Sequence, residues 1–134
     1  MRRILVTGSR DWTDRDLVGD VLEGYRNAYV GPDFIVVHGA CPTGADLFAD
    51  TWCGLNRVNV ERHPAWWHRY GNAAGPIRNQ EMVDLGAFVT LAFAKVCTKP
   101  RCEVPTPHGS HGTLDCALAA QKARIPVMVY REGW

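Results

Sequence analysis

A chain of 134 residues has room for one hydrophobic core of ordinary size, so we expect a single domain over residues 1–134. Its 15 Lys and Arg nearly balance its 14 Asp and Glu, and a formal net charge of +1 offers no general attraction to duplex nucleic acid or an anionic membrane. No apolar run is long enough for a signal peptide or a membrane span, which predicts a cytoplasmic protein. The five cysteines are an odd number, which argues against a disulfide framework.

Short apolar runs alternate with helical patterns along the chain. The weakest run, 57–62, alternates polar and apolar residues and suits an edge strand. Stronger runs, rich in Val, Ile, Leu and Phe as is typical of strands covered on both faces, lie at 3–7, 34–38, 87–94 and 125–130. Apolar residues at helical spacing fall between them, at Leu17 to Tyr25 after a Thr13 or Asp16 cap, at Leu47 to Leu55, at 75–86 and at 112–124.

This βαβαβαβαβ order predicts an α/β fold. Right-handed crossovers with one reversal give a single Rossmann-like domain, in which a five-stranded, mainly parallel sheet of order 3-2-1-4-5 has helices on both faces. Pro126 would then begin an edge strand, where its missing N–H is tolerated. The ends of the first, second and fourth strands would meet at one switch point, where such folds bind ligands.

Three glycine turns follow these three strands. Helix N-termini and free backbone N–H groups bind anions, so three such turns at one sheet edge favour a phosphate site. Turn geometry alone explains any one of the glycines equally well. The residues that we expect at the phosphate are Gly8, Ser9, Arg10, Gly39, Gly44, Gly112 and Thr113.

Four further polar residues lie near these turns, and each has two interpretations. Arg78, like Arg10, can grip two phosphate oxygens or form a surface salt bridge. Asn79 can bind ribose or base, or cap the third helix. Asp46 can accept ribose hydroxyls, or stabilise the N-terminus of the second helix. His38 can orient phosphate or transfer a proton, or be a structural histidine.

Aromatic residues cluster after the third strand. Trp66, Trp67 and Tyr70 offer flat faces on which a base can stack, and we expect Trp66 or Trp12 to contact the ligand while the others pack. The apolar stretch from Trp52 to Leu55 suits a homodimer interface, but a core role explains it equally well.

A segment without periodicity, 95–111, joins the fourth strand to the last helix and contains three prolines. Loops of this length are usually functional, which predicts an insertion or lid over the crevice. The segment also contains the pattern Cys97-x4-Cys102-x5-His108-x2-His111, whose two thiolates and two imidazoles could bind zinc. Its spacing differs from that of common zinc fingers, and no other cofactor is expected.

Four motifs together resemble a known family: Thr7-Gly8-Ser9-Arg10-Asp11-Trp12, His38-Gly39 with Thr43-Gly44-Ala45-Asp46, Ala74-Gly75-Pro76-Ile77-Arg78-Asn79-Gln80-Glu81-Met82, and Gly112-Thr113. They are similar to motifs of the SLOG superfamily of Rossmann-like proteins, and within it of the YspA/YpsA-related branch, which is often found in actinobacterial and phage genomes. The resemblance implies binding of a nucleotide or nucleotide-derived molecule by a sensing, sequestering or processing module. A phage protein would fit this branch.

Two relatives of the superfamily imply other functions. LOG-type phosphoribohydrolases cleave the N-glycosidic bond of nucleoside 5′-monophosphates, and Asp115 or Asp46 would then be the catalytic carboxylate. Against this, their Gly-Thr-x-x-Glu pattern ends here in Cys116, whose thiol cannot stabilise a sugar cation, and their Pro-Gly-Gly signature is absent. The DNA-processing protein A family implies single-stranded DNA binding, which the near-neutral charge disfavours.

Overall fold

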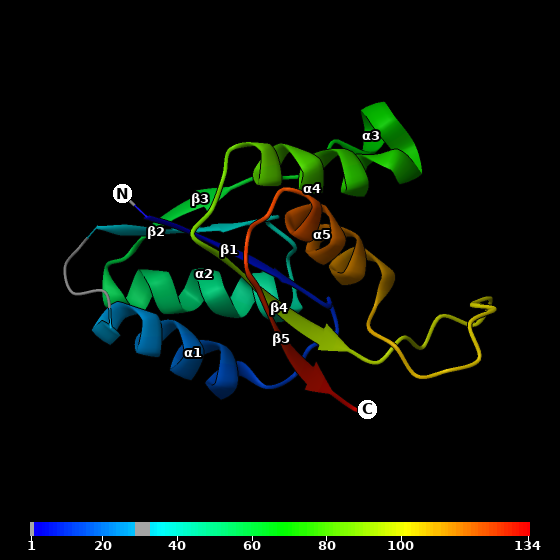
Figure 1. Ribbon diagram of the computed structural model, residues 1–134, viewed down its shortest axis with the longest axis horizontal. Coiled ribbons are helices and arrows are strands. Elements are labelled where there is room, and N and C mark those ends of the chain that lie inside the picture. The colour runs from blue at the N-terminus through cyan, green and yellow to red at the C-terminus, as the bar shows by residue number, and fades with distance from the viewer. Residues whose placement is uncertain (1, 29–32) are drawn as a thin grey trace.

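Five parallel strands form one sheet in the computed structural model, which describes residues 2–28 and 33–134 (Figure 1). The strands lie in the order β3-β2-β1-β4-β5, so the predicted fold class is confirmed and every pairing is parallel. Their bounds, in chain order, are Arg2–Gly8 for β1, Phe34–His38 for β2, Asn59–Arg62 for β3, Val89–Lys95 for β4 and Val127–Glu132 for β5. Pro126 directly precedes the edge strand β5, as expected.

Helices cover both faces of this sheet (Figure 1). Helices α1 (Arg15–Ala28) and α2 (Gly44–Asn56) pack on one face, and α4 (Ala74–Asp84) and α5 (His111–Lys122) pack on the other. A single turn, α3 (Trp67–Tyr70), continues through the 3₁₀ turn η1 (Gly71–Ala73) into α4. None of the helices described is long and apolar enough to cross a membrane.

The cap of α1 differs from the prediction. The carboxylate of Asp14 accepts a hydrogen bond from the N–H of Leu17 at 3.0 Å, so Asp14 is the capping residue and the expectation of Thr13 or Asp16 was wrong. Glu132 of β5 in turn accepts hydrogen bonds from the N–H groups of Thr13 and Asp14. The start of α1 is therefore anchored to the far edge of the sheet.

Alternation along β1 divides the core in two. Ile4 and Val6 pack under α1 and α2, whereas Leu5 packs under α4 and α5. Trp12 belongs to the first core: it is 2% exposed and meets the ring of Phe93 edge to face. The prediction that Trp12 could contact a ligand was therefore wrong.

The apolar stretch at the end of α2 serves mainly this first core. Cys53 is buried there, and Trp52 packs against Phe34 with their ring centroids 6.4 Å apart. Only Leu55 is strongly exposed. The core interpretation accounts for Trp52 and Cys53, and a homodimer remains a prediction.

An ion pair joins β1 to β3 across the intervening strand β2. Arg3 of β1 donates two hydrogen bonds, of 2.8 and 2.7 Å, to the two carboxylate oxygens of Glu61 in β3. These bonds, helped by His63, hold the pKa of Glu61 down at about 2. Because this pKa lies below that of the unfolded chain, the pair stabilises the fold above the ordinary pKa and loses its effect as pH falls towards 2.

We expect Glu61→Gln to lower the free energy of unfolding by about 1–2 kcal/mol at neutral pH, allowing for solvent screening of this partly exposed pair. The loss should shrink to less than half at about pH 3, because at that pH Glu61 is protonated in the unfolded chain while it is still mostly ionised in the folded protein. Urea unfolding at both pH values measures the difference. An equal loss at both would show that the charge of Glu61 is not what matters.

Candidate functional site

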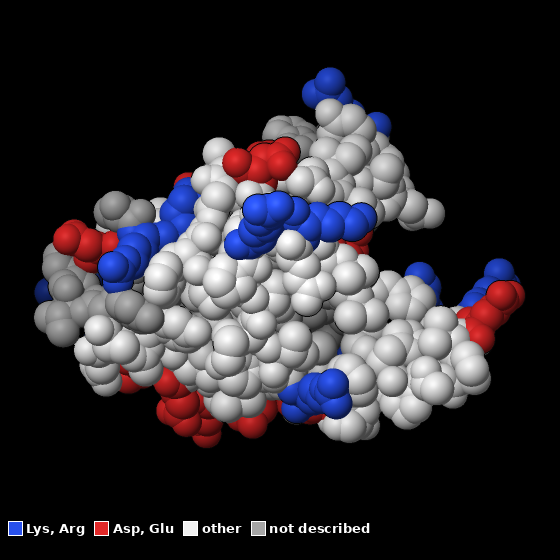
Figure 2. Space-filling model, viewed as in Figure 1, with Lys and Arg blue, Asp and Glu red and all other residues white. Residues whose placement is uncertain are grey.

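A cavity of about 1210 Å³ opens at the carboxyl ends of the strands. It lies at the switch point, where the chain leaves β1 in one direction and later returns to β4 on its other side. The turns after β1 and β2 line it, together with the first turns of α4 and α5 and the 96–110 segment, which joins β4 to α5. Figure 2 shows this hollow between the region of α3 and the 96–110 segment, on a face where acidic and basic side chains are interspersed.

Asp46 presents a buried carboxylate to the cavity. The residue is only 6% exposed, and its Oδ2 accepts a hydrogen bond from the N–H of Cys41 at 3.2 Å. Its Oδ1 is buried without a hydrogen-bond partner in the described structure. Burial raises the pKa of this carboxyl, although the hydrogen bond from Cys41 and the nearby charge of Arg78 favour its ionised form. The wall of the cavity therefore contains a buried acceptor that lacks a donor in this structure.

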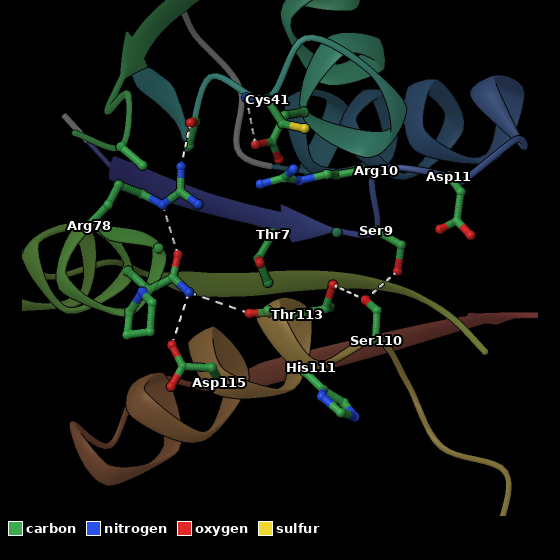
Figure 3. Close-up of a pocket in the computed structure, with 18 of the residues that line it drawn as sticks. Thr7, Ser9, Arg10, Asp11, Cys41, Arg78, Ser110, His111, Thr113 and Asp115 are labelled. Atoms are coloured by element: carbon green, nitrogen blue, oxygen red, sulfur yellow. Dashed lines mark hydrogen bonds between the residues drawn. The ribbon is translucent and has the colours of Figure 1, made fainter. Parts of the chain in front are cut away.

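Arg78, Asn79 and Asp115 form a chain across the cavity (Figure 3). Arg78 donates through Nη1 to the carbonyl of Gly39 and through Nε to Oδ1 of Asn79, at 2.5 and 2.9 Å. Asn79 donates in turn to the carboxylate of Asp115 at 3.0 Å. Among the described residues, Nη2 of Arg78 has no hydrogen-bond partner, so half of its fork is available to a ligand.

Asn79 does not cap a helix. Helix α4 begins at Ala74, and Asn79 lies inside it, 4% exposed. The capping interpretation was therefore wrong. The side chain instead links α4 to α5, since it also donates to the carbonyl of Gly112.

Three hydroxyl groups connect the turn after β1 to the start of α5 (Figure 3). Ser9 and Ser110 share a hydrogen bond of 2.6 Å, and Ser110 shares one of 2.8 Å with Thr113. Ser9 also accepts the N–H of Lys95. Because Ser110 is used in this way, its side chain does not cap α5, and the N-terminus of that helix is left uncapped at the cavity.

The glycines of the predicted phosphate turns have two different environments. A Cβ at Gly8 would lie 2.3 Å from the Cβ of Ala45, and one at Gly44 would lie 2.2 Å from the carbonyl oxygen of Ser9. Gly39 is similarly crowded by Arg78. Gly8 and Gly44 are required for close packing, whereas Gly39 is crowded only by the movable guanidinium of Arg78, and Gly112 has nothing within 4 Å and faces open cavity. Gly112 is therefore the glycine that a ligand can approach.

His38 has both of its ring nitrogens occupied. Its Nδ1 accepts the N–H of Ala40 at 2.9 Å, so Nε2 carries the proton and donates to Asp50 at 2.7 Å. The first bond holds Ala40 in a left-handed conformation, with φ of 58°, which residues with a Cβ rarely adopt. His38 is 2% exposed and does not line the cavity. The geometry favours its structural interpretation.

Aromatic lining comes from Trp67. The guanidinium of Arg10 lies over its ring, 5.3 Å from the centroid, and both residues line the cavity. Trp66, which we expected to stack on a base, is 56% exposed and is not part of the lining. The aromatic side chain that lines the cavity is therefore Trp67 rather than Trp66.

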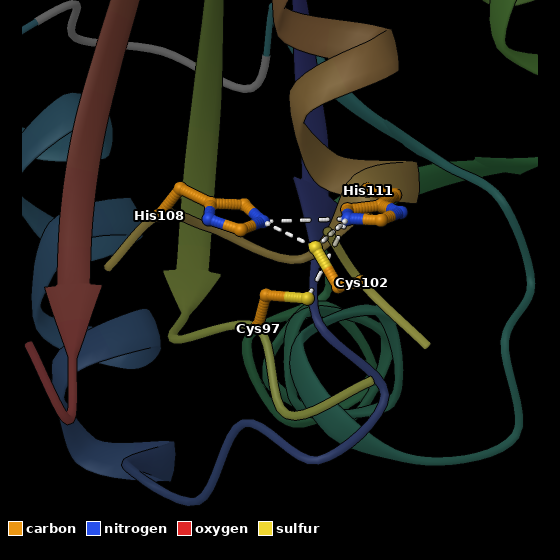
Figure 4. Close-up of side chains that lie close together, drawn as sticks. All are labelled: Cys97, Cys102, His108 and His111. Carbon is orange, nitrogen blue, oxygen red and sulfur yellow. Dashed lines mark hydrogen bonds between the residues drawn. The ribbon is translucent and has the colours of Figure 1, made fainter. Parts of the chain in front are cut away.

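The four Cys and His residues of the predicted zinc pattern come together beside the cavity (Figure 4). One potential ligand atom from each of Cys97, Cys102, His108 and His111 lies within 4.8 Å of the others. Cys97 and His111 also line the cavity. This cluster could hold a metal ion.

Cys116 lies away from this chemistry. It is fully buried in the core between β1 and α5, and burial raises the pKa of its thiol to about 11. A neutral thiol in that position supplies no negative charge to the cavity. The carboxylates that do line the cavity are those of Asp46, Asp115 and Asp11.

Sequence reasoning missed Ala40, Ser110 and Lys99, all of which line the cavity. The position of Ser110 two residues before Gly112 was the available signal, because serine often precedes a helix. Ala40 and Lys99 carry no such signal.

An all-parallel sheet with a cavity at its switch point defines a Rossmann-like protein. The profile of the YspA, cpYpsA-related SLOG family matches residues 2–70, about half of the chain. The Gene 61 protein of Mycobacterium phage D29 is 44% identical over 137 residues, a match that covers 96% of this chain and 95% of the phage protein. The chain therefore belongs to the YspA, cpYpsA-related SLOG family, as its motifs indicated. No solved structure gave a significant match.

Proposed function

We propose that this protein binds a nucleotide or a nucleotide-derived small molecule in the cavity at the carboxyl edge of its sheet. The observation that carries the proposal is the unpaired Oδ1 of Asp46, a buried acceptor at the cavity wall. A buried polar atom without a partner costs free energy, and the hydroxyl groups of a ribose would supply the missing donors.

Two donor groups suit the phosphate of the same ligand. The free Nη2 of Arg78 lies on one side of the cavity, and the uncapped N-terminus of α5, with the exposed backbone of Gly112, lies on another. A guanidinium and a helix N-terminus both stabilise phosphate charge. The paired Arg10 and Trp67 side chains offer a flat surface for the base.

The test is a thermal-shift screen of the full chain against nucleoside monophosphates and diphosphates, cyclic nucleotides, ADP-ribose and NAD, with mass spectrometry of each mixture. A ligand at a hundred times its Kd should add about 2.7 kcal/mol of stability. Recovery of that ligand intact would support a binding module. If none stabilises the protein and single-stranded DNA binds with a steep salt dependence, the small-molecule proposal fails.

Gly112→Ala separates binding from stability. An alanine in the first turn of α5 should raise the free energy of unfolding by about 0.5–1 kcal/mol, because nothing crowds the new Cβ. The methyl group would project where we place the phosphate and should weaken nucleotide binding about tenfold. Chemical unfolding and calorimetric titration of the same preparations measure both effects. A variant that is stabilised and binds with wild-type affinity would place the phosphate elsewhere.

Hydrolysis of the N-glycosidic bond of a nucleoside 5′-monophosphate is the second candidate. The raised pKa of the Asp46 carboxyl in a partly enclosed cavity favours it, since catalytic carboxyls are commonly tuned in this way. Asp115 is a second cavity carboxylate that could fill this role, and Asn79 holds it in place. Free base in the mass spectra, lost in Asp115→Asn or Asp46→Asn, would make this protein an enzyme and identify the carboxylate.

A further inference from the structure

We propose that Cys97, Cys102, His108 and His111 bind one Zn²⁺ ion in a closed tetrahedral site, and that this ion holds the 96–110 segment in place as a wall of the cavity. Two thiolates and two imidazoles are the ligand set of structural zinc sites. The proposal stands independently of which ligand the cavity binds.

Four of the six spacings between the potential ligand atoms fit one ion at their centre, and the other two lie within 4.8 Å (Figure 4). Zinc with ordinary bond lengths at tetrahedral angles requires about 3.6 Å between sulfur and nitrogen ligands and about 3.3 Å between two nitrogen ligands. The Sγ atom of Cys102 lies 3.4 Å from Nε2 of His108 and 3.4 Å from Nε2 of His111. The Sγ atom of Cys97 lies 3.5 Å from the latter, and the two Nε2 atoms lie 3.3 Å apart.

The outer nitrogen of His108 sets its tautomer. Its Nδ1 lies 2.8 Å from the carbonyl oxygen of Thr106, which can only accept, so Nδ1 carries the proton. In the neutral ring Nε2 then has a lone pair, and this lone pair faces the cluster. Zinc-bound histidines commonly donate their other N–H to a carbonyl in this way.

The backbone brings the ligands together from both ends of the segment. Val96 and Gly109 form an antiparallel bridge, and the N–H of Cys97 donates to the carbonyl of His108 at 2.7 Å. The N–H of Cys102 closes a tight turn onto Lys99. The first and third ligands are thus adjacent before any ion binds, which lowers the entropic cost of closing the site.

The segment has little else to order it. Between positions 98 and 107, every residue except Cys102 is exposed, so no apolar cluster compensates for the lost chain entropy. Three of the four ligands, Cys97, Cys102 and His108, are half-buried against each other. Metal binding supplies folding free energy where a core cannot. Because Thr98, Lys99 and His111 line the cavity, the same ion would fix their positions.

The first test measures metal alone. The purified full chain is reduced, incubated with zinc and then desalted. Inductively coupled plasma mass spectrometry should then find one zinc ion per chain. Cys102→Ser and His108→Gln should each lose it. Cys41→Ser and His68→Gln are matched controls, because these residues lie outside the cluster, and both should retain the full content. Substoichiometric zinc in the wild type, or unchanged zinc in Cys102→Ser, would overturn the proposal.

The second test measures the segment itself. Arg101 is exposed within it and precedes Cys102, so trypsin can cut there once the segment opens. Chelation should speed this cleavage at least tenfold, whereas cleavage after Arg69, exposed in α3, should not change. A Cys97–Cys102 disulfide in the protein as isolated, with cleavage that ignores chelator but responds to reductant, would replace zinc with a covalent link.

Discussion

Replacing Gly44 by alanine is expected to lower the free energy of unfolding by about 2–5 kcal/mol. Gly44 has a φ of 72°, which disfavours any residue with a Cβ, and that Cβ would lie 2.2 Å from the carbonyl oxygen of Ser9. The obstacle is backbone rather than a movable side chain. Helix α2 would have to withdraw from the turn after β1, and both carry residues of the first core. Urea unfolding followed by circular dichroism measures the loss.

Gly54 provides the matched control, because it belongs to the same helix and has nothing within 4 Å of the position of a Cβ. Gly54→Ala should raise the free energy of unfolding by about 0.5–1 kcal/mol, since alanine restricts the unfolded chain more than glycine does. Both variants replace glycine by alanine, but we expect their effects on the free energy of unfolding to have opposite signs. Similar effects at both positions would mean that the contact between α2 and the turn after β1 relaxes freely.

The sheet could be predicted from the sequence because four of its five strands lie on apolar runs, with helix patterns between them, and the short strand β3 alternates polar and apolar residues. Such patterns depend only on burial, and burial here follows the periodicities of 2 and 3.6 residues. The sequence alone does not choose Asp14 as the cap over its neighbours Thr13 and Asp16, because Glu132, at the far edge of the sheet, accepts hydrogen bonds from the N–H groups of Thr13 and Asp14.

The location of the candidate site could be predicted from the sequence, but the roles of its individual residues could be predicted less well. Parallel strands bring their carboxyl ends together, so the three glycine turns had to meet. Whether a glycine is there for a ligand or for a neighbour depends on contacts between distant segments, such as Gly8 with Ala45 and Gly39 with Arg78. Likewise, the sequence alone does not say which of Trp66 and Trp67 lines the cavity, because the start of the short helix α3 at Trp67 sets the direction of that side chain.

Asp46→Asn is expected to stabilise the free protein while weakening its ligand binding. At pH values where the wild-type carboxyl is ionised, the variant removes a buried negative charge whose Oδ1 has no donor, which should add about 1 kcal/mol to the free energy of unfolding. A carboxamide offers one acceptor oxygen where the carboxylate offers two, so the affinity for a ribose-containing ligand should fall at least tenfold. Calorimetric titration with the best ligand of the screen measures the second effect.

Asp50, one helical turn later in α2, is the control with the opposite sign. It lies outside the cavity lining, and its hydrogen bonds from Arg62 and then from His38 lower the pKa of its carboxyl. A lowered pKa stabilises the fold above the ordinary value, so Asp50→Asn should reduce stability at neutral pH and leave ligand affinity within about twofold of wild type.

The pH dependence separates these two carboxylates without any ligand. Because the folded-state pKa of Asp46 is raised, its ionisation destabilises the fold as pH rises from its ordinary value through its folded-state value. The stability difference between Asp46→Asn and wild type should therefore grow in favour of the variant over that range. For Asp50→Asn the difference should grow in favour of wild type as pH rises towards and past 3.8. If stability changes with pH in opposite directions for the two aspartates, the ionised form of Asp46 lowers the stability of the fold. A carboxylate that is retained although it destabilises the fold is expected at a ligand-binding position.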